Sequence, residues 1–254
     1  KMMLVRAMIL GLEIDLIEPS AHPVFNSKKV YDFCAMLPIQ LRNSIDNIGN
    51  FKNIIVGSVK ASIELIDAVK DFSVNIFESF GMTETATHIA LKALNNFNKE
   101  GNDFSQDKSV FKTLPDIFVS QDERGCLVIQ SPHLSKHPIV TNDIVKLYSD
   151  TEFEWLGRFD NVINSGGVKI FPESIEEKLF GKLNCKFFIA SENDDTLGER
   201  VILILEKYSD QIDASIFDVL DKYEKPKKIY AIKKFEIISD KIQRKKILKK
   251  MGLI

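Results

Sequence analysis

The segment that most constrains the fold of this chain runs from Trp155 to Glu177. Gly157-Arg158 predicts the end of a strand, and Gly166-Gly167 predicts a tight turn before a second strand. Pro172 then opens a helix, because proline at the first helical position loses no hydrogen bond and the glutamates behind it suit the helix dipole. The expected order is a strand, Asp160, a two-glycine turn, a strand that ends at Phe171, and a helix.

Composition excludes several classes of protein. The chain has 254 residues, 44% of them hydrophobic, which is enough for an extensive core. Its 34 basic and 36 acidic residues nearly cancel, so the charge gives no indication of nucleic acid as a partner. Cys34, Cys126 and Cys185 are far apart and predict neither a disulfide framework nor a zinc site. No segment reaches the roughly 20 apolar residues of a membrane span, and Lys1–Leu10 lacks the cleavage site of a signal peptide. We therefore expect a cytoplasmic protein.

Strands and helices alternate in the first part of the chain. We expect helices over 2–12 and 62–70, strands over 13–17, 52–56 and 73–78, and a helix with the start of a strand over 28–37. This alternation predicts an α/β layer with parallel pairing. From about Thr113 the pattern changes to short strands at 117–119, 126–129 and 144–147, which predicts a small β-rich subdomain.

A second domain is expected beyond Asp160. Its predicted elements are strands at 186–190, 201–206 and 229–233, a helix at about 216–223 and a basic final helix. These are enough for a compact α+β unit. The chain is therefore predicted to divide into residues 1–159 and 160–254.

The segment Glu78 to Thr85 reads E-S-F-G-M-T-E-T and lies where a strand ends and a helix is expected to begin. Gly81 would let backbone amides approach a phosphate, Thr83 offers a hydroxyl, and Glu84 offers a carboxylate for a cation that bridges phosphates. Taken alone, Thr83 as a helix cap and Glu84 as a partner of the helix dipole is the favoured interpretation.

The ordered set G-R-x-D-x(5)-G-G-x-K-x-x-P-x-x-I-E, together with F-G-M-T-E, resembles the adenylate-forming enzymes. This family contains acyl-CoA synthetases, luciferases and peptide-synthetase adenylation domains. The resemblance covers essentially the whole chain. It implies the C-terminal portion of a large α/β AMP-binding domain, including its small β-rich subdomain, over 1–159, and a small mobile α+β lid domain over 160–254. It also implies an ATP-dependent, AMP-forming acid–CoA ligase that uses Mg²⁺ and coenzyme A.

The resemblance assigns roles to residues around the nucleotide. Phe80 would lie against the adenine, Gly81 would belong to the same ATP/AMP site, Thr83 would contact the phosphates, and Glu84 would bind Mg²⁺. Asp143 would accept hydrogen bonds from the ribose, although Asn142 replaces the usual glycine before it. Arg158 would contact ribose or phosphate; as a lone arginine on a strand it would more often be a surface ion-pair partner.

Other roles concern the second domain. The resemblance implies a hinge at Asp160 and places Gly166 and Gly167 beside the arm of coenzyme A. Lys241 would stabilise charge developing on the α-phosphate and carboxylate. Arg244 matches the same motif, and Asp240 stands where the family has glycine. The alternative to a catalytic role is that this lysine-rich segment is simply a basic helix exposed to solvent.

Three residues are candidates for the acyl pocket. Gly57-Ser58 corresponds to the family's Gly-Gly-Ala turn, and Ser58 adds a hydroxyl. His88 is weighed evenly between a contact to a dicarboxylate and a histidine on a helix surface. His133 and His137 have metal-like spacing, but the prolines beside them favour a turn or strand, and we assign no metal there.

Within the family, strings such as G-M-T-E-T-A-T-H-I-A and N-V-I-N-S-G-G-V-K resemble the ligases that act on o-succinylbenzoate in menaquinone synthesis, which are bacterial and cytoplasmic. The family's Ser/Thr/Gly-rich phosphate loop ending in Pro-Lys is not found, and Lys1 is not an initiator methionine. We therefore expect upstream residues to be missing and the fragment alone to show little activity. Another aryl- or acyl-acid CoA ligase and a noncatalytic nucleotide-binding fragment remain alternatives. The oligomeric state is open, a homodimer included.

Overall fold

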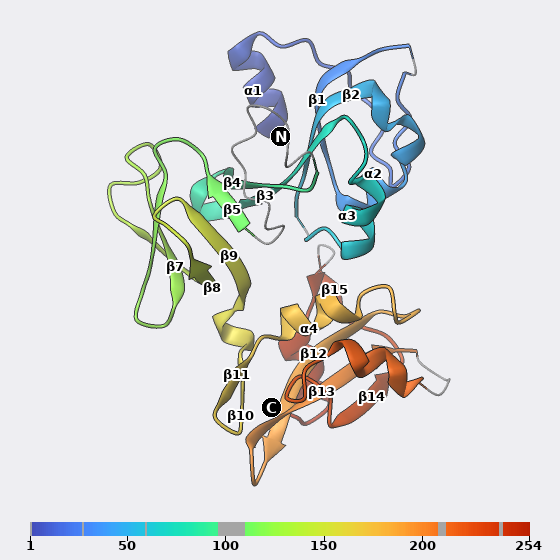
Figure 1. Cartoon of the computed structure of the whole chain (residues 1–254), viewed down its shortest axis with the longest axis vertical. Coiled ribbons are helices and arrows are strands. Elements are labelled where there is room, and N and C mark those ends of the chain that lie inside the picture. Colours follow the sequence, from blue (N-terminus) through green and yellow to red (C-terminus); the bar gives the residue numbers. More distant parts are fainter. Residues whose placement is uncertain (1, 27, 59, 96–109, 208–211, 239–240) are drawn as a thin grey trace. The chain divides into compact units, whose positions relative to one another are not determined.

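The computed structural model describes residues 2–26, 28–58, 60–95, 110–207, 212–238 and 241–254 (Figure 1). It has a mixed α/β fold with a large sheet, as predicted. The chain forms two compact units. Unit 1 contains residues 1–120, 128–140 and 147–155, and unit 2 contains residues 121–127, 141–146 and 156–254. The two units interleave along the chain, and the division into domains 1–159 and 160–254 stays a prediction.

Unit 1 is built on parallel strands. Strands β1 (Tyr31–Met36), β2 (Phe51–Val56) and β3 (Asn75–Gly81) pair in parallel, which confirms the predicted α/β layer. The helices of this region are α1 (Met2–Leu10), α2 (Pro38–Arg42), α3 (Ile63–Val69) and the 3-10 helix η1 (Ile45–Asn50). The Ser62 hydroxyl caps α3 by accepting the Leu65 N–H. Burying apolar residues from both layers stabilises the unit; they include Leu41, Ile54, Val56, Leu65 and Ile76.

Two predicted elements of unit 1 were wrong. Residues 13–17 form no strand: Leu16 is 80% exposed, so the apolar residues of this segment find no face to cover. The helix expected at the start of 28–37 is also absent, and β1 occupies the end of that range. Pairing with β2 determines the structure there, because strand propensity depends on the neighbour more than on the segment itself.

The large sheet continues beyond the parallel strands. Strands β4 (His88–Ala93) and β5 (Val110–Thr113) run antiparallel, and β9 (Glu152–Arg158) pairs with β5. The remaining strands are β8 (Ile139–Leu147), β7 (Cys126–Gln130) and β6 (Phe118–Gln121). The order is β1-β2-β3-β4-β5-β9-β8-β7-β6. The predicted β-rich segment therefore extends the same sheet.

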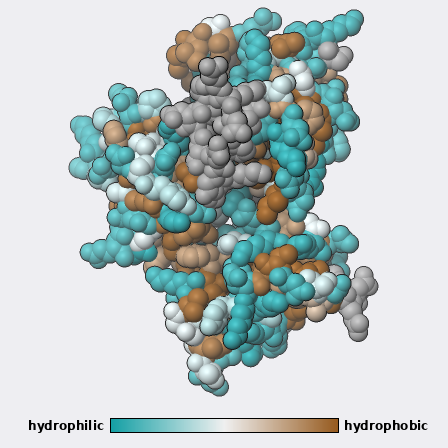
Figure 2. All heavy atoms as spheres, in the orientation of Figure 1, coloured by the Kyte–Doolittle hydropathy of each residue, from teal (hydrophilic) through white to brown (hydrophobic). Residues whose placement is uncertain are grey.

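Apolar side chains also reach the surface of unit 1. Met8 and Ile9 on α1 are each 76% exposed, and this helix carries a group of apolar atoms on the face shown in Figure 2. Ala7 of the same helix is buried. None of the described helices is long and apolar enough to cross a membrane.

The predicted two-glycine turn joins two short strands of unit 2. Strands β10 (Ile163–Ser165) and β11 (Val168–Ile170) are joined by Gly166-Gly167, whose φ angles are both positive. A two-residue hairpin turn of this kind requires left-handed backbone at both positions, which glycine adopts without strain. Helix α4 (Pro172–Leu179) comes next, as its proline predicts.

The rest of unit 2 is an α+β arrangement. Strands β12 (Phe187–Asp194), β13 (Gly198–Glu206) and β14 (Lys228–Ile232) join β10 and β11 in a five-stranded sheet, with β13 and β14 parallel. Helix α5 (Arg244–Lys250) is the predicted basic final helix, and β15 (Ile237–Ile238) pairs with β16 (Lys241–Ile242). The helix expected at 216–223 is instead a 3-10 helix, η4 (Ala214–Val219). Packing against α4 provides the order there, since so short a helix has little stability of its own.

Candidate active site

The glycine of the F-G-M-T-E segment ends β3 at a place where no side chain fits. A Cβ atom on Gly81 would lie 2.5 Å from the carbonyl oxygen of Thr87 and 2.6 Å from the Cα of His88. Both neighbours are backbone atoms, so they cannot rotate away. The chain turns through the short 3-10 helix η2 (Thr83–Thr85) and returns as β4. The helix expected after this segment was therefore wrong.

Thr85 fixes this turn. Its side chain is fully buried, and its hydroxyl accepts the Met82 N–H at 3.1 Å and lies 2.7 Å from the carbonyl oxygen of Thr87 as a donor. Ala86 has a left-handed backbone (φ 57°), an arrangement that the closed turn imposes. Thr83 and Glu84 are left exposed on the turn. Sequence reasoning missed Thr85, although the second threonine of T-E-T is the signal.

Phe80 lies at the edge of an aromatic cluster in unit 1. Its ring centroid is 5.2 Å from that of Phe153 and 5.7 Å from that of Phe111, in edge-on and tilted geometries. The side chain is half-buried, so part of the ring remains accessible. Such a ring can stack on a planar ligand while its neighbours hold its orientation.

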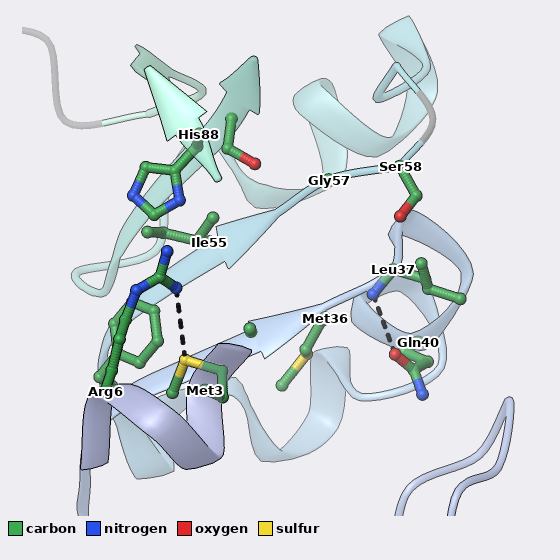
Figure 3. A pocket seen from close by; sticks show the side chains of 12 residues that line it. Met3, Arg6, Met36, Leu37, Gln40, Ile55, Gly57, Ser58 and His88 are labelled. Carbon is green, nitrogen blue, oxygen red and sulfur yellow. Dashed lines mark hydrogen bonds between the residues drawn. The ribbon is translucent and has the colours of Figure 1, made fainter. Parts of the chain in front are cut away.

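The three residues predicted for the acyl group line one pocket of unit 1 (Figure 3). Gly57, Ser58 and His88 share this pocket, whose volume is about 370 Å³. Ser58 has a left-handed backbone (φ 73°), which turns the chain at the end of β2. The other lining residues are Met3, Arg6, Phe33, Ala35, Met36, Leu37, Gln40, Ile55 and Ser79.

Arg6 gives this pocket its positive charge. Its guanidinium donates a hydrogen bond to the Thr87 hydroxyl, which lies 3.3 Å from the Nδ1 atom of His88. Figure 3 shows the side chains of Arg6 and His88 turned toward each other. Burial, and to a smaller degree the Arg6 charge, lowers the pKa of His88. His88 therefore begins a strand at a pocket and is not on a helix surface. Sequence reasoning missed Arg6, whose signal is a lone arginine within an apolar helix.

Asp143 and Arg158 meet in unit 2. The Asp143 side chain is 9% exposed, and Arg158 Nη1 lies 3.4 Å from one of its carboxylate oxygens. The Asp143 N–H is bound by the Thr141 hydroxyl at 3.0 Å. Arg158 also lies 3.9 Å from Asp160 and is 45% exposed. It is thus an ion-pair partner of the residue predicted to bind ribose, with part of its guanidinium still accessible.

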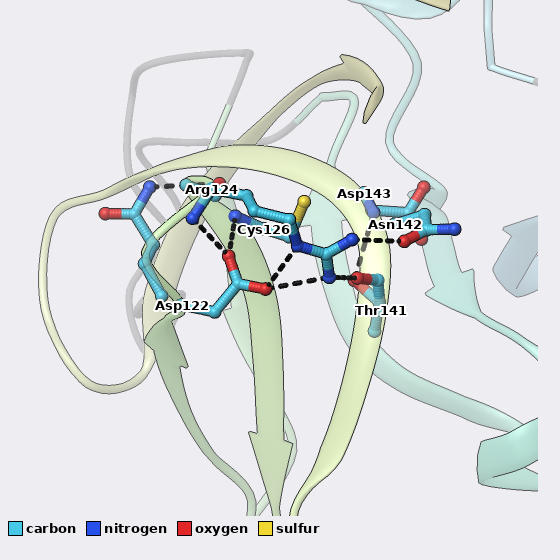
Figure 4. Close-up of polar contacts among 8 residues, drawn as sticks. Asp122, Arg124, Cys126, Thr141, Asn142 and Asp143 are labelled. Atoms are coloured by element: carbon cyan, nitrogen blue, oxygen red, sulfur yellow. Dashed lines mark hydrogen bonds and ion pairs between the residues drawn. The ribbon is translucent and has the colours of Figure 1, made fainter. Parts of the chain in front are cut away.

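Asn142, the residue before Asp143, is bound by the side chain of Arg124 (Figure 4). Arg124 donates to the Asn142 side-chain oxygen at 2.9 Å and to the Thr141 carbonyl at 3.0 Å. Asp122 holds the guanidinium at 2.8 Å, and raises the pKa of Arg124. Asn142, which replaces the glycine of the family motif, therefore gives strand β8 a side-chain contact with Arg124. Sequence reasoning missed Arg124, because only the fold brings it beside Thr141 and Asn142 on β8.

The other predicted residues of unit 2 lie on separate elements. Asp160 is in the 3-10 helix η3 (Phe159–Asn161), and Gly166-Gly167 forms the exposed hairpin turn. Lys241 begins β16, but its side chain lies outside the described residues, as does Asp240.

Arg244, the first residue of α5, is held by a partly buried carboxylate. Its Nη2 atom is 2.6 Å from Glu176 on α4. Burial raises the pKa of Glu176 to about 7, against the opposing effect of Arg244. The pair thus ties the last helix of unit 2 to α4.

The described residues contain no group of three or more His, Cys, Asp or Glu side chains that could hold a metal ion by themselves. His133 Nε2 lies 3.6 Å from Asp116, and both side chains are exposed. Glu84 is a single exposed carboxylate. One carboxylate is compatible with Mg²⁺, which is commonly held by one or two carboxylates together with water and substrate phosphates.

Comparison with known proteins identifies the family. No protein-family model matches the chain. An acyl-CoA synthetase (AMP-forming)/AMP-acid ligase II-like protein from Dyadobacter fermentans is 34% identical, over 98% of this chain and 74% of that one, with a TM-score of 0.52. The chain belongs to the AMP-forming acyl-CoA synthetases, which confirms the resemblance found in the sequence.

The names of more distant relatives specify one acid, succinylbenzoate. The 2-succinylbenzoate–CoA ligase of Listeria monocytogenes is 26% identical over 220 residues, covering 78% of this chain and 46% of the relative. The chain therefore spans about half the length of the curated relatives it matches. The o-succinylbenzoate CoA synthetase of Bacillus subtilis, solved with the acyl-adenylate OSB-AMP, is 18% identical over 85% of this chain and 50% of that one, with a TM-score of 0.69. At that identity the likeness shows the fold alone.

Proposed function

We propose that this chain carries substrate-binding residues of an AMP-forming acid–CoA ligase whose acid is o-succinylbenzoate. The observation that supports this acid is Arg6, a cation lining the same pocket as Gly57, Ser58 and His88. A dicarboxylic acid keeps one carboxylate after the other is joined to AMP, and the donor fork of a guanidinium matches carboxylate geometry. The pocket volume is within the range of small-molecule sites.

The proposed reaction has two half-reactions. In the first, a carboxylate oxygen attacks the α-phosphorus of ATP and pyrophosphate leaves, which gives an acyl-adenylate. In the second, the sulfur of coenzyme A attacks the acyl carbonyl and AMP leaves, which gives the thioester. Both steps depend chiefly on positioning and on stabilising the charge that develops at the reacting atoms.

We assign the nucleotide contacts to residues of both motifs. Phe80 would stack on the adenine, Thr83 would bind a phosphate oxygen, and Asp143 with Arg158 would bind the ribose. When bound, Mg²⁺ would neutralise charge on the phosphates, and the exposed carboxylate of Glu84 suits one of its ligand positions.

The remaining roles concern Lys241, Asp160 and the Gly166-Gly167 turn. We assign Lys241 to the charge on the α-phosphate, Asp160 to a hinge between the half-reactions, and the glycine turn to the coenzyme A arm. In an enzyme preparation that catalyses formation of acyl-AMP, Lys241→Ala should slow this first half-reaction by on the order of 10²-fold, because one preorganised cation is lost. Thioester formation from supplied acyl-AMP should change much less. Equal losses in both steps would make the lysine structural.

Two assays test the proposed function. Carboxylate-dependent exchange of labelled pyrophosphate into ATP identifies the acid, and o-succinylbenzoate should exceed benzoate and fatty acids. The 254 residues contain no Ser/Thr/Gly-rich stretch ending in Pro-Lys, so we propose that this chain alone gives little exchange but binds a stable o-succinylbenzoyl-adenylate analogue. Binding of AMP with no preference for the analogue would favour the noncatalytic alternative. Equal binding of a benzoyl-adenylate analogue would favour another aryl acid.

A further inference from the structure

A buried ion pair lies beside the proposed adenine contact. Glu78 and Lys92 are directly opposite each other on β3 and β4, with Lys92 Nζ 3.0 Å from a Glu78 carboxylate oxygen. Their side chains are only 6% and 2% exposed. Lysine is almost never this buried unless it is paired.

The stability of the sheet does not require an ion pair at this position. The neighbouring residues Ile76, Ile89 and Leu94 are fully buried and apolar. Removing two charges from water is costly, and an apolar pair of similar volume is often as stable or more so. The sequence places a carboxylate and an ammonium where two aliphatic residues would fit.

The ammonium group reaches the aromatic cluster. Lys92 Nζ lies 4.9 Å from the centroid of the Phe111 ring, which stacks on Phe153 at 5.6 Å and 20°. Both rings contact Phe80. Glu78 and Phe80 are two residues apart on β3, so their side chains leave the same face of the strand. The charge on Lys92 therefore orients the rings that hold Phe80.

The carboxylate reaches the segment just after the acyl turn. Glu78 Oε2 accepts the N–H of Ala61 at 3.4 Å. Ala61 is 1% exposed and stands between the Gly57-Ser58 turn and Ser62, the cap of α3. One ion pair thus contacts the segment carrying the acyl-pocket turn and, through Phe111, the ring proposed for the adenine.

We propose that Glu78 and Lys92 are positioning residues, which hold Phe80 and the Gly57-Ser58 turn in the geometry that an acyl-adenylate requires. This inference rests on the proposed function. Neither side chain reaches the ligand, because both are buried. Their effect is to fix the two ligand-contacting segments relative to each other within unit 1.

The test separates positioning from folding by using a neutral pair. Lys92→Met alone should lower the melting temperature, because Glu78 is left buried and unpaired. The double variant Glu78→Gln/Lys92→Met should recover the melting temperature yet bind AMP and the o-succinylbenzoyl-adenylate analogue about 10-fold more weakly, within the coupling expected of packed neighbours. The matched control is Asp32→Asn/Lys52→Met, which removes an exposed ion pair between β1 and β2.

Amide hydrogen exchange of the unliganded chain provides a second measurement that does not depend on the ligand. In the double variant, exchange should accelerate at Ala61 and in β4, while Ile66 in α3 stays protected. Wild-type affinity together with unchanged exchange would overturn the inference. If the wild-type chain binds neither nucleotide, the proposed function fails, and exchange alone then decides whether the pair orders these segments.

Discussion

The guanidinium of Arg158 lies 3.4 Å from the carboxylate of Asp143, a residue that is otherwise buried in unit 2. The acceptor lies in the middle of β8, and the partly exposed cation that holds it is the last residue of β9. We propose that Asp143 accepts hydrogen bonds from the ribose diol.

Asp143→Ala should weaken binding of AMP by about 10-fold or more, since a hydrogen bond to a charged group contributes roughly 1.5–3 kcal/mol. The variant should also lose its preference for AMP over 2′,3′-dideoxy-AMP, because both ligands then lack the ribose contact. Calorimetric titration measures both affinities. Asp150→Ala removes an exposed aspartate and should leave them unchanged. A variant that still prefers AMP would show that Asp143 does not contact the ribose.

Binding of a dicarboxylate derivative should be linked to proton uptake at His88. In the free chain, burial and, to a smaller degree, the charge of Arg6 lower the pKa of His88. A ligand carboxylate on Arg6 adds a negative charge beside the ring and raises the pKa of His88. Affinity should then rise as the pH falls from 7 toward 6. Arg6 and His88 are the titratable groups that line the pocket.

Titration in two buffers of different ionisation enthalpy measures the number of protons taken up with the o-succinylbenzoyl-adenylate analogue. His88→Gln should remove the uptake, and AMP should show none in either protein. Equal uptake by the wild type and the variant would refute the link.

Glu176 predicts a pH dependence of stability. Its pKa is raised from 4.5 to about 7, so the native state holds a proton that the unfolded state has released between these values. The free energy of unfolding should fall as the pH rises from about 4.5 to 7, by on the order of 2–3 kcal/mol. Urea denaturation at several pH values measures this slope. Glu176→Gln should flatten it, whereas Glu123→Gln, at an exposed site, should not. An unchanged slope in Glu176→Gln would assign the effect elsewhere.

Gly81 should be intolerant of any side chain. A methyl group there would press on the backbone of Thr87 and His88, so Gly81→Ala should cost about 2 kcal/mol or more of stability. Gly49→Ala is the matched control, because a Cβ at that position meets nothing within 4 Å. Thermal unfolding distinguishes the two variants. Equal melting temperatures would show that the turn can rearrange.

Local signals in the sequence were sufficient for much of the fold. The two-glycine turn and the helix opened by Pro172 were predicted correctly, because each depends on residues close together in the chain. The helix expected after Gly81 failed, since the turn is closed by Thr85 and by pairing with β4. A turn signal specifies that the chain reverses, and pairing within the sheet decides whether a helix or a strand comes next.

The sequence predicted only part of the candidate site, because some of its residues are brought together only by the tertiary structure. His88 and the Gly57-Ser58 turn were identified as candidates, and the fold brings them to one pocket. Arg6 and Arg124 were missed, because each acts on residues far away in sequence that only the tertiary structure places nearby. The sequence showed Asn142 as a departure from the family motif, but it could not predict that Arg124 is the partner of Asn142.

The proposed acid depends most directly on Arg6, and calorimetric titration of Arg6→Met tests it. The wild-type chain should bind the o-succinylbenzoyl-adenylate analogue at least 10-fold more tightly than a benzoyl-adenylate analogue, since a buried carboxylate paired with arginine contributes more than about 1.4 kcal/mol. In Arg6→Met the two analogues should bind with similar affinity, and AMP should bind as it does to the wild type. If Arg6→Met keeps the wild-type preference, or the wild type has none, the pocket does not recognise a second carboxylate and the proposed acid is wrong.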